Sequence, residues 1–322
     1  MVAQNYTRLG EEEEGLHTLI ARPAMRGTPN SEFRSNSVVE AVRRVAAPYR
    51  PAPRVRQLPT EVALAELQAR ARREQHAGMA WAVNERDQLV GLEKDSPFLV
   101  ITGREDCGRT NALSAIMREI ARVYAPGASV AVPDSHDRRP RAQVWLVSPR
   151  RELLRVLGKD YLERFTYRND EIGPWAGELN RILTARLPEA GLDVDASLEQ
   201  RWSGPEIFLV VDDADRLPAG YDAPLRELVP SANAAADVGL RIVYARRFGG
   251  WAGSDRADPL LGVMKQANAP LLVMDSDGEE GFVRGRWRGH PMAAGRGFLM
   301  DTGESGLYVQ VGHDTSPAGG AN

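Results

Sequence analysis

The segment from Gly103 to Thr110, which reads GREDCGRT, constrains the fold of this chain more than any other feature. Its spacing, G-x-x-x-x-G-[KR]-[ST], follows an apolar stretch at 98–101 and precedes a segment with apolar residues every three or four positions from Leu113 to Tyr124. This order predicts a buried strand, a phosphate-binding loop and an amphipathic helix. Glycines let successive backbone N–H groups face an anion, and the helix N-terminus adds positive potential. The segment is therefore predicted to bind the phosphates of a nucleotide.

The positions of the predicted loop have separate chemical roles. The basic side chain of Arg109 is placed to meet the β and γ phosphates of ATP, and the hydroxyl of Thr110 is placed to ligate Mg²⁺. ATP and Mg²⁺ are therefore the expected cofactors. We assign the nucleotide contacts to Gly103, Arg104, Glu105, Asp106, Cys107, Gly108, Arg109, Thr110 and Asn111.

A second part of the site lies further along the chain, where the apolar stretch at 207–211 ends in Asp212 and Asp213. In ATPases one strand-end carboxylate holds Mg²⁺, and a neighbouring acidic residue polarises the attacking water. We assign Asp212 to the metal together with Thr110, and Asp213 as the candidate catalytic base.

Departures from the usual pattern predict weak hydrolysis. Arg109 replaces the lysine of most such loops, and a planar guanidinium is bulkier than an ammonium group. Glu105 and Asp106 add negative charge beside the expected anion. Asp213 stands where active motors carry glutamate, and a base misplaced by about 1 Å can cost on the order of 100-fold in rate. We expect a site that binds ATP better than it hydrolyses it.

The remaining pattern predicts an α/β fold. Further apolar stretches at 144–147, 207–211, 240–244 and 270–274 are separated by helix-like segments, and a hairpin is expected at 80–92. Buried strands without polar alternation favour a mostly parallel sheet covered on both faces. We therefore predict a RecA-like P-loop NTPase domain over residues 58–312, with Thr60 as the N-cap of a first helix that ends near Arg73.

The two ends of the chain differ from this domain. Residues 1–57 contain an acidic run, several Pro and Gly breaks and a Pro-rich stretch, which indicate a tail and linker. A short helix is expected at 37–45, where valines recur at helical spacing. Residues 313–322 are rich in Gly, Ser and Pro, and we expect them to be a disordered tail.

Composition narrows the functional class. Forty-one basic and 44 acidic residues give a net charge of −3, so no global basic surface for nucleic acid is expected. The single cysteine, Cys107, fits a reducing compartment, and no apolar stretch is long enough to span a membrane. We expect a cytoplasmic protein that reaches the inner membrane through partners or through a segment not present in this sequence.

Weaker candidates also stand out, although ordinary structural roles, such as solvated surface or polar loop, explain them better than function does. Arg246 and Arg247 follow a strand and could present a basic group to a γ-phosphate. Cys107 at a helix N-terminus could have a lowered thiol pKa. A polyanion patch is suggested by Arg138, Arg139 and Arg141, and a metal site by Asp134, His136 and Asp137.

Five segments together resemble a known family: residues 81–87, the loop 103–110, Asp212-Asp213, 239–247 and 295–299. They look like the C-terminal ATPase domain of EccC, the FtsK/SpoIIIE-type ATPase of type VII (ESX) secretion, and residues 16–23 resemble the closing strand of a preceding ATPase domain. The resemblance implies a repeated, degenerate ATPase domain in an oligomeric membrane-associated motor. It also implies docking of the C-terminal signal of WXG-type substrate pairs, without assigning the peptide contacts.

Two other functional classes remain open at this stage. The wider family includes DNA pumps, so an active FtsK-like DNA translocase is the main alternative, although the charge argues against nucleic acid. A small-molecule kinase or GTPase could use the same loop, but the sequence shows no second-substrate site or base-specificity motif.

Overall fold

The computed structural model describes residues 57–314, except 77, 93–95, 125–128, 132–137, 141, 158–160, 189–201, 203, 277, 279–280 and 302–304, and also residues 5–6, 17–18 and 43–44. The chain divides into two units, Met1–Val55 and Arg56–Asn322. In the first unit β1 (Asn5–Tyr6) pairs antiparallel with β2 (His17–Thr18). Most of the predicted helix at 37–45, and the candidate metal residues Asp134, His136 and Asp137, lie outside the described residues.

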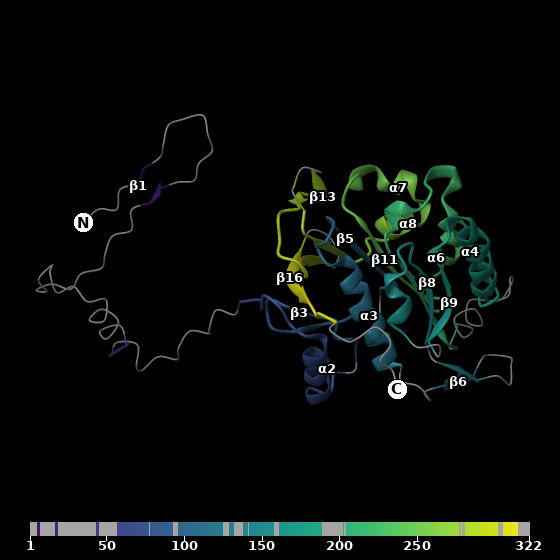
Figure 1. The fold of residues 1–322 in the computed structure, drawn as a ribbon, viewed down its shortest axis with the longest axis horizontal. Coiled ribbons are helices and arrows are strands. Elements are labelled where there is room, and N and C mark those ends of the chain that lie inside the picture. The colour runs from purple at the N-terminus through teal and green to yellow at the C-terminus, as the bar shows by residue number, and fades with distance from the viewer. Residues whose placement is uncertain are drawn as a thin grey trace, which may run out of the picture. The chain divides into compact units, whose positions relative to one another are not determined.

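The second unit is built on one ten-stranded sheet, in the order β4-β3-β16-β15-β12-β5-β11-β10-β8-β9 (Figure 1). From β12 to β9 all neighbours are parallel, and from β15 to β4 they are antiparallel. The parallel strands are β5 (Phe98–Gly103), β8 (Ala142–Val147), β9 (Leu162–Thr166), β10 (Glu206–Val211), β11 (Leu240–Arg247) and β12 (Leu271–Met274). The antiparallel strands are β3 (Ala82–Asn84), β4 (Leu89–Val90), β15 (Arg296–Met300) and β16 (Gly306–Val311).

Smaller elements complete the described structure. Two separate pairs of strands are β6 (Ser129–Ala131) with β7 (Arg138–Pro140), and β13 (Phe282–Arg284) with β14 (Trp287–Arg288). The α-helices are α2 (Leu64–Arg73), α3 (Arg109–Val123), α4 (Asn169–Thr184), α6 (Val229–Asn233), α7 (Ser254–Ala257) and α8 (Pro259–Gln266). The 3-10 helices are η2 (Glu152–Arg155), η3 (Ala214–Arg216), η4 (Gly220–Asp222), η5 (Pro224–Leu228) and η6 (Trp251–Gly253).

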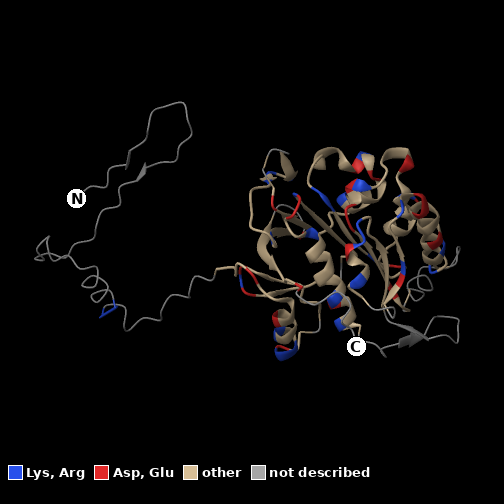
Figure 2. Cartoon of the chain, in the orientation of Figure 1, with Lys and Arg blue, Asp and Glu red and all other residues tan. Residues whose placement is uncertain are grey.

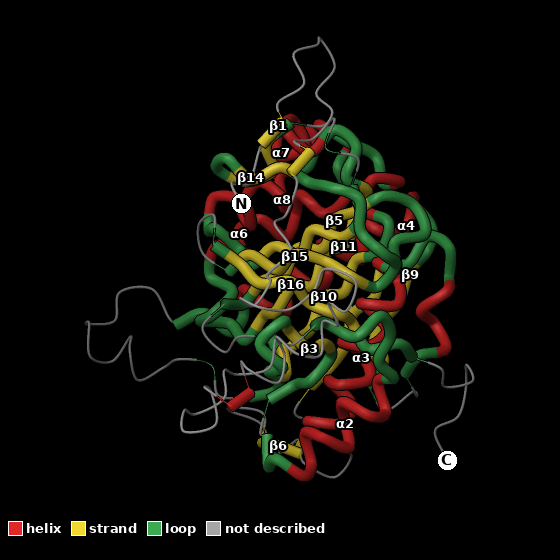
Figure 3. Tube along the Cα trace, turned by 90° about the vertical axis from the view of Figure 1, so that its left-hand side faces the viewer, coloured by secondary structure: helices red, strands yellow, loops and turns green. Residues whose placement is uncertain are grey.

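The core lies on both faces of the sheet because successive strand side chains point in opposite directions. In β5, Phe98 and Val100 pack with α4, α6 and α8, whereas Leu99 and Ile101 pack with α3. Figure 3 shows the strands running between these two sets of helices. This arrangement confirms the predicted α/β class with a mostly parallel sheet covered on both faces.

Some elements differ from the sequence prediction. Strand β9 was not predicted, because its central residues are exposed and polar enough to read as a loop. Helix α2 begins at Leu64 rather than just after Thr60, and its N-cap Ala63 makes no side-chain hydrogen bond. Among the described residues, no helix combines the length and apolar character needed to cross a membrane.

The end of the described chain is held against α3. The side chain of Asn111 donates to the backbone oxygen of Gly312 at 3.0 Å and accepts from the backbone N–H of Asp314 at 3.1 Å. The Asp314 carboxylate also accepts from Ser114 at 2.8 Å and from Arg118 at 3.1 Å. Contacts of the folded unit therefore extend as far as Asp314.

A buried carboxylate fixes α3 against the segment that leads into β3. Glu119 is fully buried, accepts from the backbone N–H of Ala80 at 2.6 Å and pairs with Arg122 at 2.7 Å. Glu119→Ala should lower the free energy of unfolding by about 2–3 kcal/mol, because both donors lose their partner. Urea denaturation measures this, with Glu163→Ala at an exposed position as the control. A loss no larger than that of the control would contradict the assignment.

Candidate nucleotide site

The predicted site residues meet at the carboxyl edge of the parallel strands. Strand β5 ends at Gly103 and β10 ends at Val211, with β11 between them. The register places Arg247 of β11 directly beside Gly103. Because parallel strands end at the same edge, the loop and Asp212 face one another across β11, in the crevice where ligands of open α/β sheets bind.

Close packing explains the glycines of the loop. A Cβ on Gly103 would approach the Cys107 sulfur to 2.6 Å, and Gly108 has a φ of 102° that side chains rarely adopt. Helix α3 begins directly after Gly108, and this N-cap residue makes no side-chain hydrogen bond. The N–H groups of the first helical turn, at the positive end of the helix dipole, suit an anion.

Thr110 and Asp212 form the candidate metal pair. The hydroxyl of Thr110 donates to Oδ1 of Asp212 at 3.4 Å, while Oδ2 of Asp212 is buried without a hydrogen-bond partner among the described residues. A hydroxyl and an unsatisfied carboxylate oxygen are ligands that Mg²⁺ accepts, with nucleotide phosphates completing its shell. No cluster of three or more His, Cys, Asp or Glu suited to a metal occurs in the described part of the chain. The donor set therefore fits a nucleotide-bound Mg²⁺.

The environment of Asp212 disfavours its charge when no cation is bound. Burial, followed by the nearby charges of Asp213 and Glu152, raises the pKa of Asp212 to about 7. An unpaired buried carboxylate is costly, and a cation at this place would remove the cost.

Arg109 does not extend into the crevice but folds back into the loop. Its Nη1 donates to the backbone oxygen of Gly103 at 2.6 Å and also to that of Arg104. Its Nη2 pairs with Oδ1 of Asp213 at 3.4 Å, and the side chain is 6% exposed. The guanidinium thus ties the loop to the end of β10.

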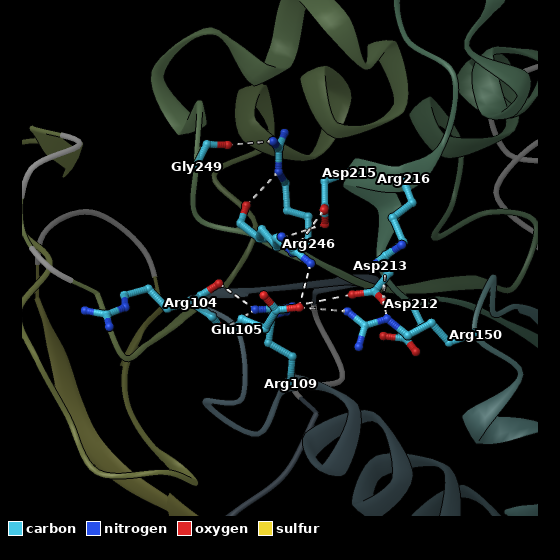
Figure 4. Close-up of polar contacts among 12 residues, drawn as sticks. Arg104, Glu105, Arg109, Arg150, Asp212, Asp213, Asp215, Arg216, Arg246 and Gly249 are labelled. Atoms are coloured by element: carbon cyan, nitrogen blue, oxygen red, sulfur yellow. Dashed lines mark hydrogen bonds and ion pairs between the residues drawn. The ribbon is translucent and has the colours of Figure 1, made fainter.

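Asp213 is surrounded by cations. Besides Arg109, its Oδ2 lies 2.6 Å from Nε of Arg150 and 3.4 Å from Nε of Arg216 (Figure 4). The residue is 2% exposed and has a φ of 46°, an unusual value for a side-chain-bearing residue. Oδ1 accepts a hydrogen bond from Arg109, and Oδ2 lies within ion-pair distance of Arg150 and Arg216 without a hydrogen bond from any described residue. Sequence reasoning missed Arg150 and Arg216; their signal is that each follows a parallel strand by a few residues.

The remaining loop residues have different surroundings. Oε1 of Glu105 lies 2.7 Å from Nη2 of Arg247 and 3.6 Å from Nη2 of Arg150. Arg104 pairs with Asp275 at 3.6 Å. Asp106 is exposed and has a φ of 58°.

Three other candidates are oriented away from the crevice or are chemically quiet. The side chain of Asn111 donates to the backbone oxygen of Gly312, as described above. Arg246 donates to the backbone oxygens of Arg247 and Gly249, and Arg247 pairs with Glu105 of the loop. Burial raises the pKa of the Cys107 thiol, which contradicts the idea of a lowered pKa at the helix N-terminus.

Sequence comparison identifies close relatives. No family model matches the chain. The ESX-5 secretion system protein EccC5 of Mycobacterium tuberculosis is 48% identical over 320 residues, which cover 97% of this chain. The chain spans 23% of the length of that relative.

Solved structures agree with this relationship. A structure described as an ATPase is 46% identical, with a TM-score of 0.71, and the match covers 81% of this chain and 98% of that one. The Thermomonospora curvata EccC structure of ATPases 2 and 3 in complex with a signal sequence peptide is 26% identical. Its TM-score is 0.72, and the match covers 94% of this chain and 52% of that one.

The raised pKa of Asp212 predicts a pH-dependent stability in the absence of nucleotide. Between the unfolded value of 3.8 and the folded value of about 7, the folded state binds more protons, so stability falls as pH rises through this window. Asp212→Asn removes the ionisation and should be more stable than the parent chain by a few kcal/mol at pH 8, with the difference shrinking toward pH 4.

Urea denaturation at several pH values measures this difference. Asp222→Asn makes the same change at an exposed position and gives the background. Asp212→Asn that is no more stable than the parent chain at pH 8 would contradict the assigned burial cost.

Proposed function

Because the chain belongs to the EccC family of type VII secretion ATPases, we propose that it binds ATP with Mg²⁺ between β5 and β10 and hydrolyses it slowly or not at all. The observation that carries the proposal is the juxtaposition of Thr110 and Asp212 beside the N-terminus of α3, with Oδ2 of Asp212 buried and without a hydrogen-bond partner in the described part of the chain. These features supply a cation ligand set and an anion site at one place.

In this proposal, the loop backbone and a few side chains bind the nucleotide and its Mg²⁺. The loop N–H groups hold phosphate oxygens, and Arg109 adds positive charge from within the loop. Thr110 and Asp212 would hold Mg²⁺, which neutralises charge on the phosphates when bound. Because most phosphate contacts come from the backbone, binding does not depend on lysine at position 109.

Slow turnover follows from the surroundings of Asp213. A general base needs a free lone pair within hydrogen-bond reach of the attacking water. Asp213 instead forms ion pairs with Arg109, Arg150 and Arg216, which compete with a water molecule for its oxygens. Aspartate is also shorter than the usual glutamate by one methylene, so the carboxylate lies further from the reacting phosphate.

We extend the proposal to substrate docking and assembly. The T. curvata relative was solved with a signal sequence peptide, and this chain is proposed to dock the C-terminal signal of WXG-type substrates in the same way. Its other partners would be subunits or domains of an oligomeric secretion complex on the cytoplasmic face of the membrane. Figure 2 shows basic and acidic residues interspersed over the described folded unit, which favours a protein partner over DNA.

Thr110→Ala tests the nucleotide site. The variant should bind Mg-ATP at least about tenfold more weakly, while its binding of ATP without Mg²⁺ changes little, because only the metal ligand is lost. Titration calorimetry with and without Mg²⁺ measures both affinities. Thr184→Ala, on the exposed side of α4, is the matched control. Equal affinity of the parent chain and Thr110→Ala for Mg-ATP would contradict the proposed metal-nucleotide site.

Fluorescence anisotropy tests the partner. A labelled C-terminal peptide of a WXG-type substrate should bind, and binding should persist at high salt, because an apolar groove holds a helical peptide by buried area. The peptide should bind Thr110→Ala equally well. A labelled DNA duplex should not bind. Tight, salt-sensitive DNA binding without peptide binding would instead support the translocase alternative.

A further inference from the structure

Glu105 places a carboxylate of the loop itself between the ends of neighbouring strands. Its Oε1 lies 2.7 Å from Nη2 of Arg247, which ends β11, and 3.6 Å from Nη2 of Arg150, which follows β8. In Figure 4 Glu105 lies centrally, with Arg109 and Arg150 beside it and Asp213 beyond. The carboxylate therefore occupies the crevice between the loop and the end of β10.

The two arginines around Glu105 have the chemistry of a phosphate site. Guanidinium groups bind carboxylate and phosphate with the same donors, so a carboxylate held by two arginines marks a place where a phosphate would fit. Arg150 also contacts Asp213 at 2.6 Å, which locates this place on the hydrolysis side of the crevice. That side receives the terminal phosphate, whereas the loop N–H groups hold the inner ones.

We propose that Arg150 and Arg247 are ligands of the γ-phosphate, and that Glu105 takes the place of this phosphate when no nucleotide is bound. Glu105 must leave before the third phosphate can enter, so it lowers the affinity for ATP relative to ADP. This inference rests on the proposed nucleotide site, and it identifies the residues that distinguish a triphosphate from a diphosphate there.

The exposures of these side chains make the exchange feasible. Glu105 is 54% exposed and its partners Arg247 and Arg150 are 36% and 32% exposed, so their ion pairs are solvated and weak. A terminal phosphate carries more charge and more acceptor oxygens than a carboxylate, and it forms stronger bonds to the same donors. The Arg109–Asp213 pair, at 6% and 2% exposure, is held much more firmly and stays in place.

The neighbouring residue provides a matched control. Asp106 carries the same charge in the same loop, is exposed, and has no ion pair with any described residue. Asp106→Asn removes one negative charge without releasing Arg150 or Arg247, and asparagine tolerates the positive φ at this position. Any general electrostatic gain from lowering the loop charge will therefore appear in Asp106→Asn as well.

The experiment is titration calorimetry of the full chain with Mg-ATP and Mg-ADP. Glu105→Gln should tighten ATP binding by about three- to tenfold and change ADP binding by less than about twofold. Asp106→Asn should change the affinities for ATP and ADP by the same factor. Arg150→Gln should weaken the binding of ATP more than the binding of ADP. When Glu105→Gln is added to Arg150→Gln, it should tighten ATP binding by a smaller factor than it does in the parent chain. Thermal unfolding confirms that each variant is folded.

Each outcome supports or contradicts the proposed role of Glu105. An ATP-to-ADP affinity ratio that Glu105→Gln leaves unchanged, with both nucleotides still bound, overturns this inference and leaves the proposed function standing. If neither the parent chain nor Glu105→Gln binds any nucleotide, both proposals fail. If ATP binding appears only in Glu105→Gln, Glu105 blocks the site and the inference is supported.

Discussion

The buried guanidinium of Arg109 joins the two halves of the candidate nucleotide site. A cation that is 6% exposed needs acceptors, and here its two terminal nitrogens find them in the backbone oxygens of Gly103 and Arg104 and in a carboxylate oxygen of Asp213, while Nε is buried without a partner among the described residues. The same side chain thus stabilises the curl of the loop and joins it to the strand that carries the two aspartates. A lysine, with a single compact ammonium, could not bridge these groups in the same way.

This bridge separates the roles of two adjacent carboxylates. Asp213 is paired with arginines, whereas Asp212 makes no ion pair among the described residues and leaves one oxygen unsatisfied. Asp212 therefore suits a cation, whereas the arginines around Asp213 compete with an attacking water for its oxygens. We propose that cation binding and hydrolysis use different aspartates, so that a site can keep the first function and lose the second.

Local sequence predicts much of the fold and part of the candidate site. The features that it does not predict have a physical explanation. Apolar runs and the glycine spacing predict the strands, the loop and the Thr110–Asp212 pair, because parallel strands bring their carboxyl ends together. The family and the α/β class are likewise confirmed. The positions of long side chains could not be predicted in this way. The orientation of Arg109 and the approach of Arg150 to Asp213 depend on partners far away in sequence. Asn111 illustrates the same limit: its position predicts a nucleotide contact, and sequence alone does not show that its side chain binds the backbone of Gly312.

We propose that the candidate site retains ATP because Asp213, the residue in the position of the base, is paired with arginines. It is tested by mixing the chain with Mg²⁺ and less than one equivalent of labelled ATP, then identifying the bound nucleotide by chromatography after prolonged incubation. We expect the label to remain in ATP. Recovery of the label as bound ADP after a short incubation would show that Asp213 acts as an efficient base despite its arginines, and would contradict the proposed slow hydrolysis.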